Sequence, residues 1–500
     1  MSALRAGVEF EVVIGLEIHV QLLTSSKMFC ACPTTFGAPP NTQVCPVCLG
    51  LPGSLPVLNG RAVDLGVRTA VALNCTVHPQ SRFHRKNYYY PDLPKNYQVT
   101  QYQYLVHPPL ATGGWMEIAA GGRRRRIGIR RVHLEEDTGR LVHPGHGRYS
   151  LVDYNRSGVP LMEIVTDPDL RAPQEARTFL ARLRAVLQAI GVSTGRMEEG
   201  SLRVDANVSL RRFGEALGTR TEVKNMNSLR SVERALLFEV ARQRQVLTAG
   251  GAVEQETRHW DEDRGVTFAS RSKEEAQDYR YFPEPDLVPL VVPRTAAEAA
   301  AMGVTAVKAV EEVREDLPEL PEQRRQRYLR DFGLSEYDAD LVTSSASMAA
   351  FFEETVRRFP QPKTVSNWLV GDVTAYLNAE GRELEDLPVT PDHLAELLRL
   401  IEAGTVSGRT AKELLPEILA SGARPGDLVR ARGLAQISDR EALQAVVEEV
   451  VREYPAPVAD VRAGKTQAMT FLVGQVMKKT RGRANPEMVT ALLREHLRSP

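Results

Sequence analysis

The 500-residue sequence has few cysteines, no long apolar run and no net charge, and each shortage narrows the class of protein. Five cysteines are far too few for a secreted disulfide scaffold. Nowhere do eighteen apolar residues run together, and the first residues lack the basic and apolar segments of a signal peptide. Lysine plus arginine equals aspartate plus glutamate at 63 each, so net charge indicates no partner. We expect a cytoplasmic protein that does not associate with membranes.

Several catalytic motifs are missing as well. The sequence contains no G-x-x-x-x-G-K-[ST] loop and no kinase-type glycine-rich loop. A nucleotide would therefore bind at a site that lacks both of these phosphate-binding motifs. It contains no G-x-S-x-G elbow and no S-x-x-K motif, and its serines have no recognisable base partner. A nucleophile of the hydrolase type is therefore not expected.

The first half of the sequence is rich in predicted strands. Residues 8–22 alternate well enough for one long strand. A helix is predicted from Pro173 to Ile190, where Gly191 ends it, and a second over residues 228–249, ended by two glycines. Both helices have one apolar face and are expected to pack on a sheet.

The composition changes near residue 290, where an extended, proline-rich stretch gives way to helical periodicity that continues almost to the end. Further breaks occur at VSGRT and ASGARPGD. The predicted class is α+β: a mixed α/β domain over residues 1–295, a helical connector over 296–408 and an all-helical tail domain over 409–500.

Four of the five cysteines lie within MFCACPTTFGAPPNTQVCPVCLG. Cys30 and Cys32 are one residue apart, and Cys45 and Cys48 have C-x-x-C spacing, so two close pairs can supply four thiolates to a tetrahedral zinc. Iron-sulfur binding, redox chemistry and plain buried thiols remain alternatives. A redox C-x-x-C would start a helix, and LGLP after the second pair starts none. Four thiolates leave no open position, so the zinc would be structural.

Polar side chains recur at alternate positions of predicted strands, where residues two apart share one face. These pairs are Glu17 with His19, Asp205 with Asn207, and Glu222 with Lys224. A carboxylate run, Glu135, Glu136 and Asp137, stands at the end of another predicted strand. Inside a sheet they cost free energy unless they are paired or bind something. Hard oxygen ligands with amides and a lysine predict a site for Mg²⁺ and phosphate, whereas each run alone is also typical of a solvated strand face.

Two basic stretches suggest a nucleic-acid partner. RKNYYYPDLPKNYQ places Lys86 among tyrosines, which suits a nucleotide or an RNA end but also suits a core-facing strand. Near the C-terminus, Lys478, Lys479, Arg481 and Arg483 cluster at a predicted helix end. Such cations can simply complement the helix dipole, and we favour contact with RNA phosphates.

Long motifs across nearly the whole chain resemble the B subunit of the aspartyl/glutamyl-tRNA(Asn/Gln) amidotransferase. The resemblance is carried by IGLEIHVQL, the cysteine stretch, RKNYYYPDLPKNYQ, HLEEDTGR, LVDYNRSGVPLMEIV, MEEGSLRVDANVSL, EVKNMNS, DYRYFPEPDL, GTVSGRTAKELL and GKTQAMTFLVGQVMKKTRGRANP.

This resemblance implies a heterotrimer with an amidase A subunit, which releases ammonia from glutamine, and a small C subunit. A chain of this family binds misacylated Asp-tRNA(Asn) or Glu-tRNA(Gln), phosphorylates the side-chain carboxylate with ATP and lets ammonia displace phosphate. The resemblance also implies a cradle-shaped N-terminal fold with Mg²⁺, followed by a helical domain and a tail that contacts the tRNA body. A cognate aminoacyl-tRNA synthetase is a further expected partner. A non-catalytic zinc-containing tRNA-binding scaffold is the alternative.

Carried over by position, Glu17, His19, Glu135 and Glu136 match the family's metal region, and Lys86 lies beside the catalytic pocket. The same pocket is lined by Asp205, Asn207, Glu222 and Lys224. Arg156 and Glu163 are candidates for an ammonia path or a subunit interface. Some family members lack the cysteines, so the resemblance implies that zinc is not needed for the chemistry.

Overall fold

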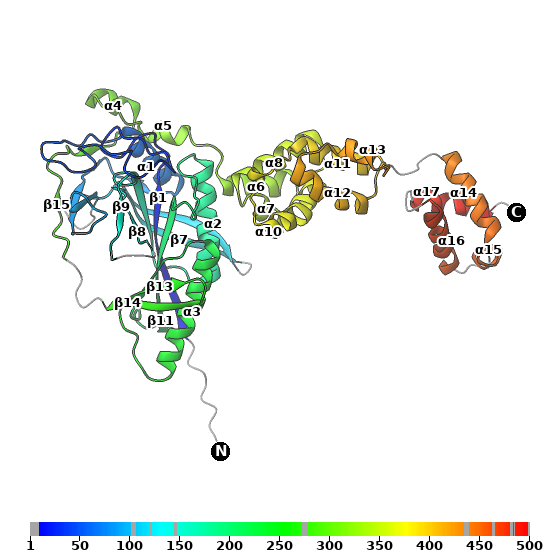
Figure 1. Ribbon diagram of the computed structural model, residues 1–500, viewed down its shortest axis with the longest axis horizontal. Helices are drawn as coiled ribbons and strands as arrows, with labels where there is room; N and C mark the ends of the chain where they lie inside the picture. Colours follow the sequence, from blue (N-terminus) through cyan, green and yellow to red (C-terminus); the bar gives the residue numbers. More distant parts are fainter. Residues whose placement is uncertain are drawn as a thin grey trace, which may run out of the picture. The chain divides into compact units, whose positions relative to one another are not determined.

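The computed structural model describes residues 10–101, 107–120, 123–144, 148–272, 278–434, 440–462, 466–480, 484 and 486–498. The chain divides into two compact units, Met1–Pro321 and Glu322–Pro500 (Figure 1). The first is a mixed sheet with helices and the second is helical, so the predicted α+β class is confirmed. The division into three domains with limits at 295 and 408 stays a prediction.

The strands of the first unit are, in chain order, β1 (Phe10–Gln21), β2 (Thr76–Val77), β3 (Gln80–Ser81), β4 (His84–Asn87), β5 (Tyr97–Thr100), β6 (Ala111–Ala120), β7 (Arg123–Glu136), β8 (Arg140–Val142), β9 (Leu151–Asp153), β10 (Pro160–Thr166), β11 (Leu202–Arg212), β12 (Thr221–Lys224), β13 (Glu256–Asp261), β14 (Val266–Ser272), β15 (Phe282–Pro283) and β16 (Leu290–Val291). Its helices are α1 (Gly60–Ala72), α2 (Pro173–Ala189), α3 (Leu229–Thr248), α4 (Ala296–Met302) and α5 (Val310–Glu315).

Twelve of the described strands form one sheet whose centre is the long strand β1. The order is β14-β13-β12-β11-β1-β10-β7-β5-β4-β15, and β6 with β2 joins beside β7. The pairing is antiparallel except between β12 and β13. The strand predicted over residues 8–22 is confirmed as β1 over Phe10–Gln21, while residues 8 and 9 lie outside the described residues.

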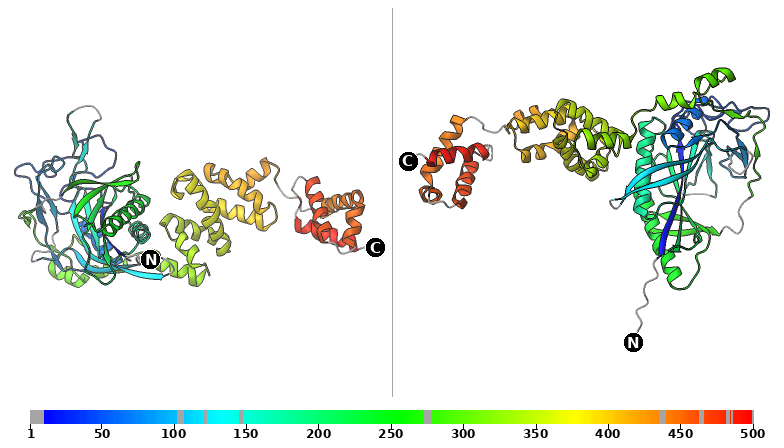
Figure 2. Two further views of the ribbon diagram at one scale, coloured as in Figure 1. Left: turned by 90° about the horizontal axis from the view of Figure 1, so that it is seen from below. Right: turned by 180° about the vertical axis from the view of Figure 1, so that it is seen from behind.

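Helices α1, α2 and α3 cover one face of this sheet (Figure 1; Figure 2). Both predicted helices are confirmed. α2 starts with Pro173 in its first turn, and Gly191 follows it with a φ of +67°. α3 starts at an N-cap, Ser228, whose hydroxyl accepts a hydrogen bond from the Ser231 N–H. Such caps satisfy backbone donors that the first helical turn leaves unpaired.

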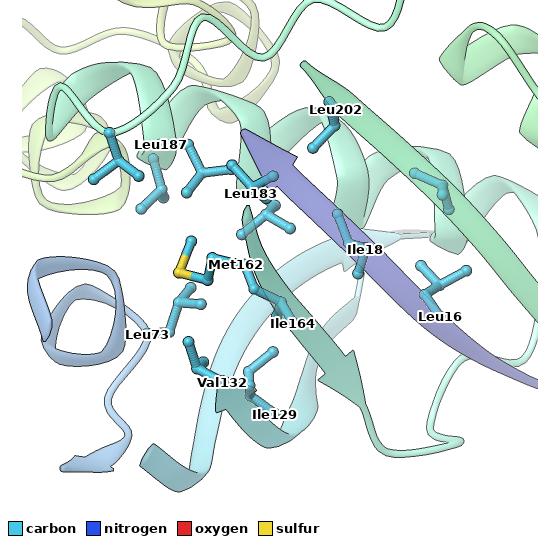
Figure 3. Packing of buried hydrophobic residues seen from close by; sticks show 14 of the residues in the cluster. Leu16, Ile18, Leu73, Ile129, Val132, Met162, Ile164, Leu183, Leu187 and Leu202 are labelled. Carbon is cyan, nitrogen blue, oxygen red and sulfur yellow. The ribbon is translucent and has the colours of Figure 1, made fainter. Parts of the chain in front are cut away.

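The core of the first unit lies between these helices and the sheet. Figure 3 shows Leu16 and Ile18 of β1 and Ile164 of β10 in this core together with Leu183 and Leu187 of α2. These side chains occupy alternate strand positions and one helical face, as their spacing predicts. The polar residues that alternate with these core residues along the strands therefore project from the opposite face of the sheet.

The second unit contains α6 (Pro321–Asp331), α7 (Glu336–Val342), α8 (Ala346–Arg358), α9 (Pro362–Trp368), η1 (Leu369–Val373), α10 (Thr374–Glu380), η2 (Leu384–Asp386), α11 (Pro391–Glu402), α12 (Gly408–Ser421), α13 (Pro425–Ala431), α14 (Arg440–Glu453), α15 (Pro455–Arg462), α16 (Thr466–Lys479) and α17 (Pro486–Arg498). Among the described residues these helices form two hydrophobic clusters, one from Tyr328 to Val429 and the other from Leu443 to Leu497. No helix in the described part of the chain is long and apolar enough to cross a membrane.

Candidate active site

The face of the sheet opposite the helices carries polar side chains on neighbouring strands. Residues that lie opposite each other in an antiparallel pair project from the same face. The register sets these side chains in rows: His19 with Glu163 and His133, Glu17 with Asp205, and Asn207 with Glu222. The alternating polar pairs of the sequence therefore share one surface, which we call the polar face.

At one part of the polar face, a histidine and two glutamates form a group that could hold a metal ion. One nitrogen or oxygen from each of His19, Glu135 and Glu163 lies within 4.8 Å of the others. His19 Nε2 lies 3.4 Å from an oxygen of each glutamate. Behind them, His133 Nε2 lies 3.5 Å from Glu163 and 3.6 Å from Glu135, and Arg131 donates to Glu163 at 2.9 Å. The donor set of carboxylates with an imidazole suits a divalent cation such as Mg²⁺ or Mn²⁺.

Without a metal, the positive charge of His19 and the negative charges of Glu135 and Glu163 stabilise one another. Burial opposes charge on His19, but its hydrogen bond to Glu163 and the charges of Glu135 and Glu163 raise the pKa of His19 to about 9. Burial likewise opposes ionisation of Glu163, yet the charge of His133 and the hydrogen bond with His19 hold the pKa of Glu163 well below its ordinary value. The group can therefore exist as a buried ion-pair network or as a set of metal ligands.

A second polar cluster lies on β11 and β12. The Lys224 ammonium contacts Asp205 at 2.5 Å and Glu222 at 3.2 Å. The Asn207 amide donates to Glu17 at 3.1 Å. Burial, followed by the nearby carboxylates of Glu163, Glu222 and Asp205, raises the pKa of Glu17. Glu17 thus links the two clusters and is surrounded by negative charge that a bound cation would relieve.

The three consecutive acids Glu135, Glu136 and Asp137, of which the first two end β7, contact different partners. Glu135 joins His19. Glu136 instead forms an ion pair with Lys95 and accepts the Val99 N–H at 2.9 Å, and Asp137 accepts from Arg203 at 2.8 Å. Successive strand residues point to opposite faces, so the structure does not bring Glu136 together with the His19 group.

A hollow opens in the polar face next to Glu17. Its lining includes Gly15, Arg130, Asn207 and Arg220. Gly15 shares the face with Glu17 and His19 but has no side chain, which leaves room over β1. The hollow combines cations, an amide and backbone, and can accept a polar ligand beside the His19 group.

Lys86 lies on β4 within an aromatic setting. Its ammonium is 4.8 Å from the ring centroid of Tyr279 and 5.7 Å from that of Tyr88, and these two rings meet edge to face. Cation–π contacts of this kind hold a lysine at a fixed place without neutralising its charge. Of these two rings, only Tyr88 belongs to the stretch in which a cation among tyrosines was predicted, and Tyr279 comes from a distant part of the chain.

The four clustered cysteines come together as their spacing predicts. The Sγ atoms of Cys30, Cys32, Cys45 and Cys48 all lie within 4.8 Å of one another, and the five cysteines of the chain are free thiols. Residues 46–50 form turns, so the second pair begins no helix. A hydrogen bond from Cys30 lowers the pKa of the Cys48 thiol to about 4 despite burial. This cysteine knuckle, residues 30–48, is compatible with structural zinc. Cys75, which lies outside the knuckle, is buried.

The basic cluster near the C-terminus is partly visible. Lys478 is exposed at the end of α16, whereas Lys479 forms ion pairs with Glu449 at 2.8 Å and Glu453 at 2.7 Å. Arg481 and Arg483 lie outside the described residues. At least one of the predicted RNA-contacting cations is thus already paired within the protein.

Sequence reasoning named Glu163 for a different role and did not single out His133. A signal existed for both. Glu163 is the acid within β10, a strand whose seven residues are all buried. His133 stands two residues before Glu135 on β7, which is the same spacing that singled out Glu17 with His19.

Two family models match the chain: the GatB/GatE catalytic domain over residues 12–298 and the GatB domain over residues 350–497. The chain is 55% identical over 493 residues to the B subunit of the aspartyl/glutamyl-tRNA(Asn/Gln) amidotransferase from Moorella thermoacetica, and the match covers 98% of this chain and 100% of that protein. It is 51% identical over 493 residues to the protein of the same name from Carboxydothermus hydrogenoformans, covering 98% and 99%.

Proposed function

The chain belongs to the family of aspartyl/glutamyl-tRNA(Asn/Gln) amidotransferase B subunits, and we propose that its polar face activates a tRNA-bound carboxylate with ATP. The substrate is Asp-tRNA(Asn) or Glu-tRNA(Gln). An oxygen of its side-chain carboxylate takes the γ-phosphoryl group of ATP, giving an acyl phosphate and ADP. Ammonia then attacks the acyl carbon, a C–N bond forms, the C–O bond to phosphate breaks, and inorganic phosphate leaves with the amide product.

The observation that carries this proposal is the convergence of His19, Glu135 and Glu163 from three neighbouring strands. These residues would hold Mg²⁺, which when bound neutralises the negative charge of the phosphates. Phosphoryl transfer needs positioning and charge neutralisation more than a covalent protein nucleophile. The absence of a hydrolase motif from the sequence agrees with that requirement.

The surrounding side chains have distinct proposed tasks. Lys224 would contact phosphate oxygens; its ammonium lies at the polar face in ion pairs with Asp205 and Glu222. The amide of Asn207 and the carboxylate of Glu17 border the hollow and would orient the bound groups. Lys86 would approach the acceptor end of the tRNA. Glu136, paired with Lys95, lies outside this set.

The remaining parts of the proposal concern partners. We propose that the chain works with an amidase A subunit, which supplies ammonia from glutamine, and with a small C subunit. Lys478, Lys479, Arg481 and Arg483 of the tail would contact the tRNA body, with a cognate aminoacyl-tRNA synthetase nearby. The cysteine knuckle would hold zinc for shape, since four thiolates leave no position for substrate.

A scaffold without catalysis is the competing function, and the internally paired charges of the polar face favour it. The discriminating experiment reconstitutes the trimer with His19→Ala or Glu163→Gln and measures ATP cleavage, transamidation and tRNA affinity. We expect both reactions to fall at least about 100-fold while tRNA affinity stays within about twofold. Glu117→Gln is the matched control, because Glu117 lies on β6 in ion pairs with Arg124 and Arg126, away from the His19 group. ATP cleavage that survives in both test variants would leave the scaffold as the better description. Mischarged tRNA(Asn) and tRNA(Gln), tested separately, identify the substrate.

A further inference from the structure

Lys27 is a lysine with no solvent exposure that lies against the cysteine knuckle. Its Nζ is 3.6 Å from Cys48 Sγ and donates a hydrogen bond to the Tyr154 carbonyl at 3.2 Å. Lysine is almost never fully buried unless it is paired. The Tyr154 carbonyl is neutral, so the charge of Lys27 requires an anion, and its side-chain acceptor is the sulfur of Cys48.

The backbone fixes Lys27 in this place. Its N–H donates to the Cys32 carbonyl at 3.0 Å, and its own carbonyl accepts from the Asn59 amide at 3.2 Å. Lys27 is therefore tied to both halves of the knuckle, to Cys32 through the main chain and to Cys48 through the side chain. A surface lysine that folded inward by chance would not have these restraints.

Close packing around Gly158 brings the lysine and the sulfur together. Gly158 has a φ of +86°, and a Cβ placed there would lie 3.5 Å from both Cys48 Cβ and Lys27 Cδ. A side chain at this position would be strained by the positive φ, although its Cβ would make only ordinary van der Waals contacts with the two neighbours. The glycine thus lets the main chain pass directly over the lysine–cysteine pair.

The nearby carboxylate does not account for Lys27. Glu136 lines the same pocket but is engaged by Lys95 and by the Val99 N–H. The pocket thus holds two lysines, and one of them already has a carboxylate partner. Glu284 and Asp286 also line the pocket, and both form ion pairs with Arg85. The anion that remains for Lys27 is therefore the thiolate set of the knuckle.

The positive charge of Lys27 would balance part of the negative charge of a zinc ion bound by four thiolates. Zinc bound by four thiolates carries a net charge of about −2, and a partly buried anion is stabilised by hydrogen bonds and by a counter-charge. The Cys45 N–H supplies a hydrogen bond to Cys48 Sγ at 3.2 Å. Lys27 supplies the full positive charge. Groups that hydrogen-bond to metal ligands typically change metal affinity by about 10- to 100-fold.

We propose that Lys27 is the counter-cation of the zinc-loaded cysteine knuckle, a positioning residue that retains the metal through Cys48. The proposal rests on the zinc occupancy proposed above and is independent of the phosphoryl-transfer chemistry. It identifies the lysine of the SKMFCAC stretch as part of the metal site, although lysine is not itself a zinc ligand.

The test measures zinc transfer to a chromophoric chelator from the full-length chain in its assembled complex. Lys27→Met is expected to release zinc about 10- to 100-fold faster than the wild type. Lys27→Gln, which can still donate to the Tyr154 carbonyl, should show the same direction and provides the comparison if the methionine variant fails to fold. Lys95→Met is the matched control, because Lys95 lines the same pocket but pairs with Glu136, and it should release zinc within about twofold of the wild-type rate.

Three results would overturn the proposal in distinguishable ways. Wild-type chain purified under zinc-replete conditions that contains no zinc would remove the zinc occupancy itself, and the role of Lys27 with it. Equal zinc release from zinc-loaded wild type and from folded Lys27→Gln would leave the zinc site standing and remove Lys27 from it. Faster release from Lys95→Met as well would show that any cation in the pocket matters, and would contradict a specific role for Lys27.

Discussion

The raised pKa of His19 predicts how the stability of the protein without divalent cation depends on pH. Protonated His19 is stabilised in the folded state by Glu163 and Glu135, which places its pKa near 9 against an ordinary value of 6.5. For a group whose folded pKa is raised, the stabilisation is complete below the unfolded pKa and is lost as pH rises through the folded pKa. His19 should therefore favour folding fully below about pH 6.5 and contribute nothing above about pH 9.

The size of the effect follows from the difference of 9 − 6.5 = 2.5 pKa units. At ~1.36 kcal/mol per unit this gives a ceiling of about 3 kcal/mol. The His19 side chain is 23% exposed, so solvent screening reduces the expected loss to roughly 2–3 kcal/mol.

The assay is urea unfolding of the magnesium-free chain at a series of pH values, for the wild type and for His19→Gln. Other titrating groups are common to both proteins, so the difference in unfolding free energy isolates His19. The wild type should lose roughly 2–3 kcal/mol more than the variant between pH 6 and about pH 9.5. Glu163→Gln should also flatten the difference, since it removes the hydrogen-bond acceptor of His19. Parallel pH profiles for wild type and His19→Gln would refute the described network.

Three further perturbations test other parts of the molecule. Lys224→Met should lower the rate of ATP cleavage by about 100-fold in steady-state kinetics with little change in tRNA affinity, and Lys224→Arg should recover part of it; full activity in Lys224→Met would remove the lysine from the phosphate site. Cys48→Ser should lose zinc and on the order of 3 kcal/mol of unfolding free energy, measured by metal analysis and urea unfolding; a stable, folded variant without catalysis would mean that the knuckle takes part in the reaction. Truncation after Leu434 removes the second helical cluster and should weaken tRNA binding at least about tenfold in a filter-binding assay, while glutamine hydrolysis by the partner continues; unchanged tRNA affinity would contradict the role proposed for the tail.

Much of the first unit could be predicted because its signals are local. The long strand β1, the start of α2 at Pro173 and the clustering of the four cysteines each depend on a few neighbouring residues, and each is confirmed. The strand period of two also placed Glu17 with His19, and Asp205 with Asn207, each pair on one face of its own strand before any partner strand was known.

What the sequence did not reveal depends on register between distant segments. Glu163 meets His19 because β10 pairs with β1 at that residue, and the two residues are far apart in the chain. A single-residue slip would turn Glu163 to the other face, and no local pattern excludes such a slip. The partners of Lys479 were hidden for a similar reason, because Glu449 and Glu453 belong to another helix.

The end of β7 shows why a run of acids in a sequence should not be treated as one site. Alternation sends Glu135 to the polar face, where two histidines hold it, and sends Glu136 toward Lys95 and the pocket beside the cysteine knuckle. One strand end thus serves two compartments that a sheet separates. Glu136→Gln should for that reason leave the divalent-cation affinity of the His19 group nearly unchanged, whereas Glu135→Gln should weaken it by about 10- to 100-fold. Equal losses of Mn²⁺ affinity in the two variants, measured by titration calorimetry, would mean that both carboxylates reach the same ion, against the contacts that the structure places around each.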